Sequence, residues 1–97
     1  MDFKRWGYDF EGFFYSASSL KQNAGVYVVW CNKDRVLDVG ESENVKYRVQ
    51  YHDRKNSWRR QCSGTVYYSV AYIVDEQERK KLEKKIRELE NPPCGEI

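Results

Sequence analysis

Five side chains of this sequence are of types that could act together on a phosphodiester bond: Tyr27, Asp38, Arg48, His52 and Glu83. A carboxylate can hold a divalent metal ion that polarises the phosphate. An arginine can offset the negative charge that develops on the phosphate oxygens, and a tyrosine or a histidine can move the proton of an attacking water. If these side chains meet in one cleft, the chemistry that they favour is phosphodiester hydrolysis.

Three segments are predicted to be β-strands from their apolar, β-branched and aromatic side chains: residues 26–31, 35–39 and 66–74. Turn-forming residues join the first two segments, which predicts an antiparallel hairpin. Side chains alternate between the two faces of a strand, so Tyr27 and Asp38 could share one face of this hairpin. A slip of one residue in the register would separate them.

The first helix is expected to begin at Ser42, whose hydroxyl could cap it, and to end at His52. Val45, Val49 and His52 recur at helical spacing and would form its core face. Arg48 lies one turn before His52, so both side chains would lie on one side of the helix, at the rim of that core face. The sequence therefore predicts that an arginine and a histidine approach the ends of the strands.

A short helix over residues 58–62 and a longer C-terminal helix complete the predicted elements. Asp75 followed by Glu78 matches a capping box at the start of the longer helix, and Pro92 predicts its end. The apolar stripe of this helix is predicted to contain Leu82, Ile86 and Leu89. Glu83 is next to this stripe, so we expect it to border the core instead of facing open water.

The element order β-β-α-(α)-β-α predicts an α+β fold, in which helices pack against a small sheet that contains the antiparallel hairpin. The 97 residues suffice for a single domain with one core. We expect residues 24–95 to form the motif-bearing core, and residues 1–23 to be an aromatic N-terminal extension that packs over the sheet. No apolar run approaches the roughly 20 residues that span a bilayer, and the N-terminus lacks the apolar core of a signal peptide. A cytoplasmic protein with no membrane partner is the expectation.

The net charge of +2 is too small to indicate nucleic-acid binding by itself, but basic residues are concentrated in residues 46–60. Basic side chains interleaved with aromatic ones suit phosphate contact and base stacking. The candidates for nucleic-acid contact are Lys46, Arg54, Lys55, Trp58, Arg59 and Arg60. A basic helix that only faces solvent would give the same pattern.

The three cysteines, Cys31, Cys62 and Cys94, are an odd number at wide spacing, which argues against a disulfide framework. We expect free and mostly buried thiols. A zinc site built from these cysteines and His52 would lack the closely spaced cysteine pair that is usual for such sites.

The order of these motifs resembles that of the GIY-YIG nuclease superfamily. The first half-motif is similar to GVY at residues 25–27, and the second is similar to DVG at residues 38–40. Residues 40–52 are similar to the family's glycine, capped helix, arginine and histidine, and residues 83–95 to its glutamate, aliphatic residues and proline ending. The resemblance covers residues 25–95. It implies a three-stranded antiparallel sheet flanked by helices and the activity of a metal-dependent endonuclease acting on DNA more than on RNA.

The resemblance also implies a role for each matching residue. Tyr27 would be the general base or would orient the attacking water, and Arg48 would stabilise the phosphate. His52 would assist at the phosphate or in proton transfer. Glu83 would be the sole protein ligand of a divalent metal, Mg²⁺ or Mn²⁺. The structural glycines of the site would be Gly25 and Gly40.

Two departures from the family pattern bear on activity. Asp38 stands where the second half-motif has its tyrosine, and the family's closing asparagine falls near Gly95, so it is missing or displaced. In one interpretation, Asp38 is a second carboxylate that accepts the proton of Tyr27 or adds a metal contact. In the other, the site is degenerate and the scaffold binds nucleic acid or a protein without catalysis. A competent site is favoured because the other residues of the family's site are all present: Tyr27, Arg48, His52 and Glu83.

Nucleases of this family usually take their specificity from an attached DNA-binding domain. The sequence shows no such domain, so we expect action on structured or nonspecific DNA, or a specificity supplied by a homodimer or a protein partner.

Overall fold

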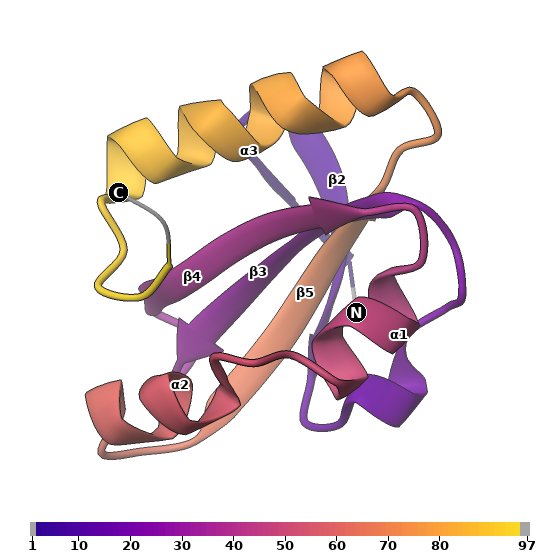
Figure 1. The fold of residues 1–97 in the computed structure, drawn as a ribbon. Helices are drawn as coiled ribbons and strands as arrows, with labels where there is room; N and C mark the ends of the chain where they lie inside the picture. Colours follow the sequence, from indigo (N-terminus) through magenta and orange to yellow (C-terminus); the bar gives the residue numbers. More distant parts are fainter. Residues whose placement is uncertain (1, 96–97) are drawn as a thin grey trace.

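The computed structural model describes residues 2–95, which form one antiparallel sheet with helices on both faces (Figure 1). The strands are β1 (Asp2–Arg5), β2 (Tyr8–Phe14), β3 (Gly25–Cys31), β4 (Arg35–Ser42) and β5 (Val66–Tyr72). The helices are a short 3-10 helix, η1 (Ala17–Ser19), and α1 (Val45–Gln50), α2 (Lys55–Gln61) and α3 (Glu76–Glu90). The predicted α+β class and the antiparallel β3–β4 hairpin are therefore confirmed. Within residues 2–95, no helix is both long and apolar enough to cross a membrane.

The sheet has five strands in the order β1-β2-β5-β3-β4, whereas the sequence predicts three. The additional strands come from the aromatic N-terminal segment, which continues the sheet beside β5 instead of packing over its face. Trp6 and Gly7 have positive φ angles of 53° and 83° and form the tight turn between β1 and β2. Because a lone glycine is a weak turn signal, the sequence does not predict this hairpin.

The two faces of the sheet carry different helices, and this places the candidate residues. Tyr27 of β3 faces α1 and α2, and it packs with Val45 and Val49 of α1. Its strand neighbours Val26 and Val28 face the opposite way and pack with α3 (Figure 1). β4 is one of the two edge strands of the sheet, so groups from both helical layers can meet around its edge.

α1 begins later than predicted, whereas α3 begins after Asp75 as predicted but without the predicted capping bond. Ser42 is not the cap of α1, because β3–β4 pairing continues as far as Ser42 opposite Gly25. Asn44 caps the helix instead, and its side-chain oxygen accepts a hydrogen bond from a backbone N–H of the first turn at 3.1 Å. Asp75 is the N-cap residue of α3, but its side chain makes no capping bond, so the predicted capping box is wrong. The helix ends before Pro92, as predicted.

The buried stripe of α3 also differs from the prediction at one position. Leu82 and Ile86 are buried as expected, but Leu89 is 63% exposed. Arg79 is buried instead, and its Nε donates to Glu41 Oε1 of β4 at 2.8 Å. The same guanidinium also donates to backbone carbonyls before α3, so the buried charge is paired and hydrogen-bonded.

Cys31 and Cys62 form a disulfide, which corrects the expectation of three free thiols. Cys31 is the last residue of β3 and Cys62 follows α2, and their Cα atoms are 5.5 Å apart. The fold brings them together although they are 31 positions apart in the sequence, so their spacing carried no signal. Cys94 is free and buried, as expected. No zinc site is formed among residues 2–95.

Candidate active site

Tyr27 lies directly opposite Gly40 on the β3–β4 hairpin. An added Cβ at Gly40 would overlap the ring and hydroxyl of Tyr27, so the absence of a side chain makes room for the phenol. Asp38 pairs with Val29, two residues along each strand, and so shares the face of Tyr27. Gly25 makes a different close approach, because a Cβ there would clash with the backbone of β5.

His52 follows α1 and makes a hydrogen bond with Tyr27. The distance between His52 Nε2 and Tyr27 Oη is 3.0 Å. The backbone N–H of Arg54 donates to the other ring nitrogen of His52, Nδ1, at 3.0 Å. An accepting Nδ1 has no proton, so the proton of the neutral ring is on Nε2. His52 therefore donates its Nε2–H to the hydroxyl oxygen of Tyr27.

The surroundings of this pair keep both groups neutral. Burial, helped by the positive charges of Arg48 and Arg54, lowers the pKa of His52 from 6.5 to about 4. Burial raises the pKa of Tyr27 from 10.0 to about 12, although Arg48 acts in the opposite direction. Arg48 and Arg54 lower the pKa of Tyr27 and so favour its phenolate, and the Nε2–H of His52 is a hydrogen-bond donor to the same oxygen.

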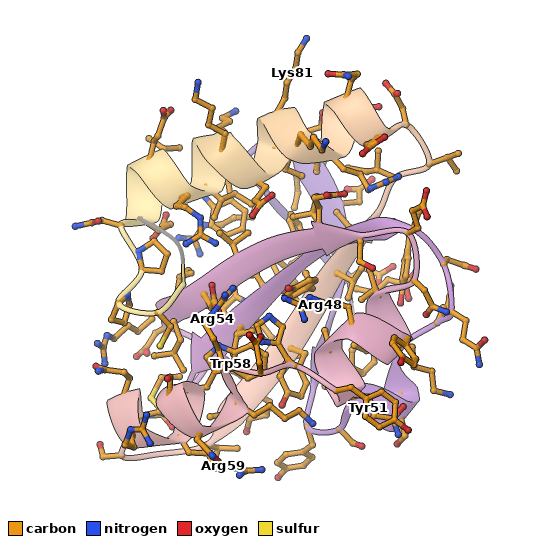
Figure 2. The ribbon with its side chains drawn as sticks, in the orientation of Figure 1. Arg48, Tyr51, Arg54, Trp58, Arg59 and Lys81 are labelled. Carbon is orange, nitrogen blue, oxygen red and sulfur yellow. A yellow bond between two sulfur atoms is a disulfide. The ribbon has the colours of Figure 1, made fainter. Side chains whose placement is uncertain are left out.

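Arg48 is the charged residue of α1 that turns toward the sheet. Figure 2 shows its side chain in the space between α1 and β4, near Arg54 and Trp58. Its guanidinium also reaches Asp53 Oδ1 at 3.7 Å, and its side chain remains 41% exposed. Arg48 can therefore act on Tyr27 and still be reached by a phosphate from solvent.

Asp38 is completely buried, and protein donors surround its carboxylate. Oδ2 accepts from Arg54 Nε at 2.9 Å and from Trp58 Nε1 at 2.8 Å. Oδ1 accepts from the Val39 N–H at 2.8 Å and from Arg87 Nη2 at 3.4 Å. This arrangement makes Asp38 the ionic centre that joins β4 to α2 and α3.

These contacts bear on the two roles that the sequence suggested for Asp38. The hydroxyl of Tyr27 is hydrogen-bonded to His52, whereas the carboxylate of Asp38 is bonded to the cations and N–H groups around it. A role as the proton acceptor of Tyr27 therefore has no hydrogen bond to support it. A metal contact at Asp38 would have to displace one of its protein donors.

Two of the predicted nucleic-acid contacts are engaged by other residues of the protein. Trp58 is 1% exposed and packs its ring against that of His52 with a centroid distance of 4.6 Å, so it cannot stack on a base. Arg54 is committed to Asp38. Trp58 is buried because it is the residue through which the short α2 packs against the sheet. The candidates that remain at least partly exposed are Lys46, Arg54, Lys55, Arg59 and Arg60.

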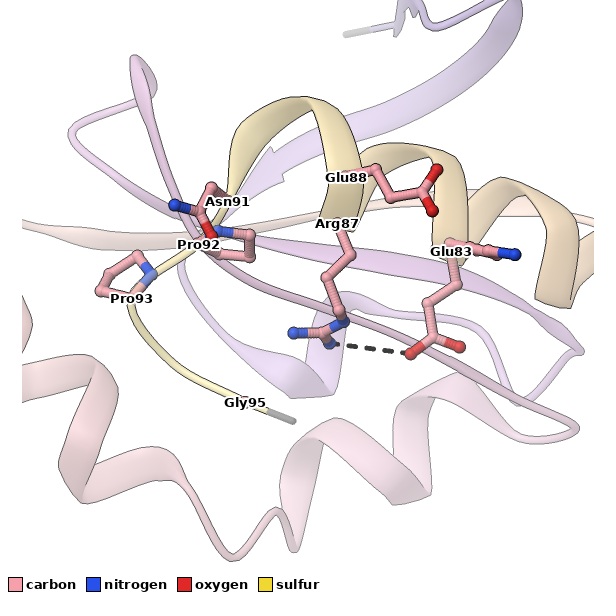
Figure 3. A pocket seen from close by; sticks show the side chains of 8 residues that line it. Glu83, Arg87, Glu88, Asn91, Pro92, Pro93 and Gly95 are labelled. Atoms are coloured by element: carbon pink, nitrogen blue, oxygen red, sulfur yellow. Dashed lines mark ion pairs between the residues drawn. The ribbon is translucent and has the colours of Figure 1, made fainter. Parts of the chain in front are cut away.

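Glu83 lies on α3 and lines a cavity of about 770 Å³ with Arg87 and the residues that follow the helix. Figure 3 shows the ion pair between Glu83 Oε2 and Arg87 Nη2, whose atoms are 3.7 Å apart. Burial raises the pKa of Glu83, Arg87 lowers it, and the nearby Glu41 raises it further. Glu83 is thus a half-buried carboxylate with Arg87 at 3.7 Å and the acidic Glu41 nearby. A second cation beside Glu83 would favour its ionised form.

Glu83 fits the role of a single metal ligand. In the part of the chain that the structure describes, no three His, Cys, Asp or Glu side chains cluster in a way that could hold a metal ion. Mg²⁺ keeps several of its water ligands and commonly takes only one or two carboxylates from a protein, with substrate phosphates completing its shell. One accessible carboxylate beside an open cavity satisfies this requirement.

The structure brings the candidate residues together in two linked groups. Tyr27, Arg48 and His52 form one group on the α1 side, and they do not line the cavity beside Glu83. Arg87 Nη2 contacts both Glu83 and Asp38. Asp38 accepts a hydrogen bond from Trp58, whose ring packs against His52, so Arg87 and Asp38 together connect the groups. Sequence reasoning missed Arg87, whose position one helical turn after Glu83 was the available signal.

The sequence matches no protein-family model and no curated protein. Its fold is similar to solved structures of the GIY-YIG N-terminal endonuclease domain of UvrC from Thermotoga maritima. The form bound to its catalytic divalent cation, magnesium, has a TM-score of 0.61 and 15% identity, over 75% of this chain and 83% of that chain. A point mutant bound to the catalytic divalent cation has a TM-score of 0.63 and 12% identity, over 79% of this chain and 87% of that chain. The resemblance seen in the motifs is thus confirmed for the fold.

Proposed function

We propose that this protein is a metal-dependent endonuclease that hydrolyses phosphodiester bonds in DNA. The observation that carries the proposal is the hydrogen bond from His52 Nε2–H to Tyr27 Oη, made beside the accessible Arg48. The fold gives independent support, because the UvrC domain that shares it is an endonuclease with a catalytic divalent cation. The half-buried Glu83 carboxylate supports the same chemistry.

The α1 side of the site binds the phosphate and handles the proton. Arg48 binds the scissile phosphate and offsets the charge that develops on its oxygens. Tyr27 orients the attacking water, and after its phenol has lost its proton to solvent, the phenolate accepts the proton of that water. His52 donates its Nε2–H to the phenolate oxygen and so favours the ionised form of Tyr27. His52 is not itself the base, because its Nδ1 is engaged and its pKa of about 4 makes it a weak proton acceptor.

The α3 side of the site holds the metal. Glu83 is the protein ligand for Mg²⁺ or Mn²⁺, and Arg87 fixes the direction of its side chain. When bound, the ion polarises the phosphate and stabilises the departing oxygen. Asp38 positions Arg87 through an ion pair. It also accepts hydrogen bonds from Arg54 and Trp58, which lie on the α1 side of the site.

A second candidate function is a scaffold that binds nucleic acid or a protein without cleaving anything. The observation that favours it is Asp38, which replaces the family tyrosine with a carboxylate that is fully enclosed by protein donors. This position therefore supplies no hydroxyl to the site. In this case, Glu83 and a divalent metal would not matter for binding.

Nicking of supercoiled plasmid DNA with Mg²⁺ or Mn²⁺ tests the proposal against this alternative. Wild type should nick the plasmid only with the metal, and Glu83→Ala should lose at least about 100-fold in rate while keeping its circular-dichroism spectrum. Glu76→Ala is the matched control, because Glu76 is an exposed glutamate at the start of the same helix and does not line the cavity beside Glu83. Metal-independent DNA binding without nicking, unchanged in Glu83→Ala, would support the scaffold instead.

The proposed partner is DNA, with specificity supplied by a second copy of the chain or by another protein. Parallel reactions on an RNA transcript test the preference for DNA. Sedimentation of the protein with and without DNA tests for the dimer.

A further inference from the structure

Tyr47 and Tyr51 form an exposed aromatic pair on the outer side of α1. Their relative exposures are 64% and 65%, far above those of the other aromatic residues around α1 and α2. They lie one helical turn apart, with ring centroids 5.0 Å apart and ring planes at 54°. Figure 2 shows Tyr51 at the outside of α1, while Arg48 of the same helix points into the molecule. Neither ring is needed for the core, so the pair is free to contact a ligand.

A shallow pocket of about 190 Å³ lies beside the two rings. Its other lining residues are polar: Gln22, Asn44, Lys46 and Gln50. Amide groups can donate and accept hydrogen bonds at the edge of a heterocycle, and an ammonium group can pair with a phosphate. Rings that meet at an angle offer one face for stacking and one edge for lateral contact. The chemistry of the pocket therefore suits a flat, polar ring that carries a phosphate.

The position of the pair on α1 relates it to the proposed cleavage site. Arg48 is next to Tyr47 in the sequence and acts on Tyr27 from the same short helix. Because these residues belong to one helix of 6 residues and its C-cap, a strand whose phosphate is bound by Arg48 can extend around α1 toward the tyrosines. In a continuous duplex the bases are stacked inside and present only their edges, so a base can reach a tyrosine face only if it is unpaired.

We propose that Tyr47, Tyr51 and this pocket bind an unpaired nucleobase, so that the substrate class is single-stranded or locally unpaired DNA. This inference rests on the proposed nuclease function for the position of the scissile phosphate. The binding site itself is defined by the tyrosines and the polar lining. Lys46 supplies the charge for the phosphate that is attached to the bound base.

The test is the affinity for a fluorescent oligothymidylate and for a duplex of the same length, measured by anisotropy at one salt concentration in EDTA. Tyr47→Ala/Tyr51→Ala should lose about 10-fold or more in affinity for the single strand and little for the duplex. Tyr47→Phe/Tyr51→Phe keeps the ring faces and should stay within about threefold of wild type. Tyr15→Ala is the matched control, because Tyr15 is also exposed, at 74%, but belongs to another part of the chain.

Several outcomes would overturn the inference. Single-strand affinity that is unchanged by the double alanine substitution would do so, as would an equal loss for the duplex. A change only in self-association, seen by sedimentation, would assign the tyrosines to a protein contact instead. The assay contains no divalent metal, so its result is separate from cleavage. If no nuclease activity is found but the single-strand preference depends on the tyrosines, the proposed function fails and the base-binding site stands.

Discussion

The Tyr27–His52 pair shows how neighbouring groups decide the role of a single side chain. A histidine near a tyrosine could be an acid, a base or a hydrogen-bond donor. The Arg54 N–H occupies Nδ1, which leaves the Nε2–H to donate to Tyr27. In the proposed mechanism, His52 is thereby a positioning residue that favours ionisation of Tyr27, a distinction that residue type and spacing alone do not provide.

The lowered pKa of His52 predicts a loss of stability in acid. Between pH 6.5 and about pH 4, the unfolded chain binds a proton at His52 that the folded protein does not bind. The free energy of unfolding should therefore fall as the pH drops through this window, and His52 should add no pH dependence above it. His52→Gln should remove part of this loss. Urea unfolding curves at several pH values measure it, and parallel pH profiles for the two proteins would contradict it.

Asp38 should matter for stability, because its charge opposes those of Arg54 and Arg87. Asp38→Asn keeps a similar shape but leaves these cations without their buried partner, and it should lower the free energy of unfolding by about 3 kcal/mol. Asp9→Asn, at an aspartate whose side chain is 81% exposed, should change it by less than about 0.5 kcal/mol. Chemical denaturation provides both values. If Asp38→Asn were fully stable but bound Mn²⁺ more weakly, Asp38 would be a metal ligand.

At the scale of the elements, local patterns identified β3, β4, β5 and the three α-helices but not the β1–β2 hairpin. The predicted strands are dense in β-branched side chains, and the helices have apolar residues at helical spacing. The hairpin depends on a turn with a single glycine and on pairing with β5, which is far along the chain. The burial of Trp58 and Arg79 also depends on packing between elements, so local charge patterns mislead there.

The Cys31–Cys62 disulfide should stabilise the attachment of α2 to the sheet. It closes a loop whose ends are 31 positions apart, for which loss of chain entropy in the unfolded state corresponds to about 3–4 kcal/mol. Cys31→Ser/Cys62→Ser should lower the free energy of unfolding by about that amount, and a reducing agent should do the same to wild type. Cys94→Ser should remain sensitive to the reducing agent. Equal stability of wild type with and without the reducing agent would contradict this prediction.

At the scale of the whole molecule, the edge position of β4 lets the proposed site draw on two groups of residues, one from each helical layer. α1 contributes Arg48 and leads to His52 on one face, and α3 on the other face contributes Glu83 at the strand edge. The sequence predicts these residue types and their order, because each is fixed by a local motif. It does not predict Arg87 as the link between the layers, because that contact depends on how α3 crosses the edge strand.

The proposed endonuclease activity is tested most directly by the single-turnover rate at which wild type and Tyr27→Phe nick a supercoiled plasmid in Mg²⁺. The substitution removes only the hydroxyl that His52 positions, and the ring that packs against α1 remains. We predict metal-dependent nicking by wild type and a loss of about 100-fold or more in the folded variant. Equal rates for the two proteins, or no nicking by wild type on any DNA, would contradict the assignment of Tyr27 to the chemical step.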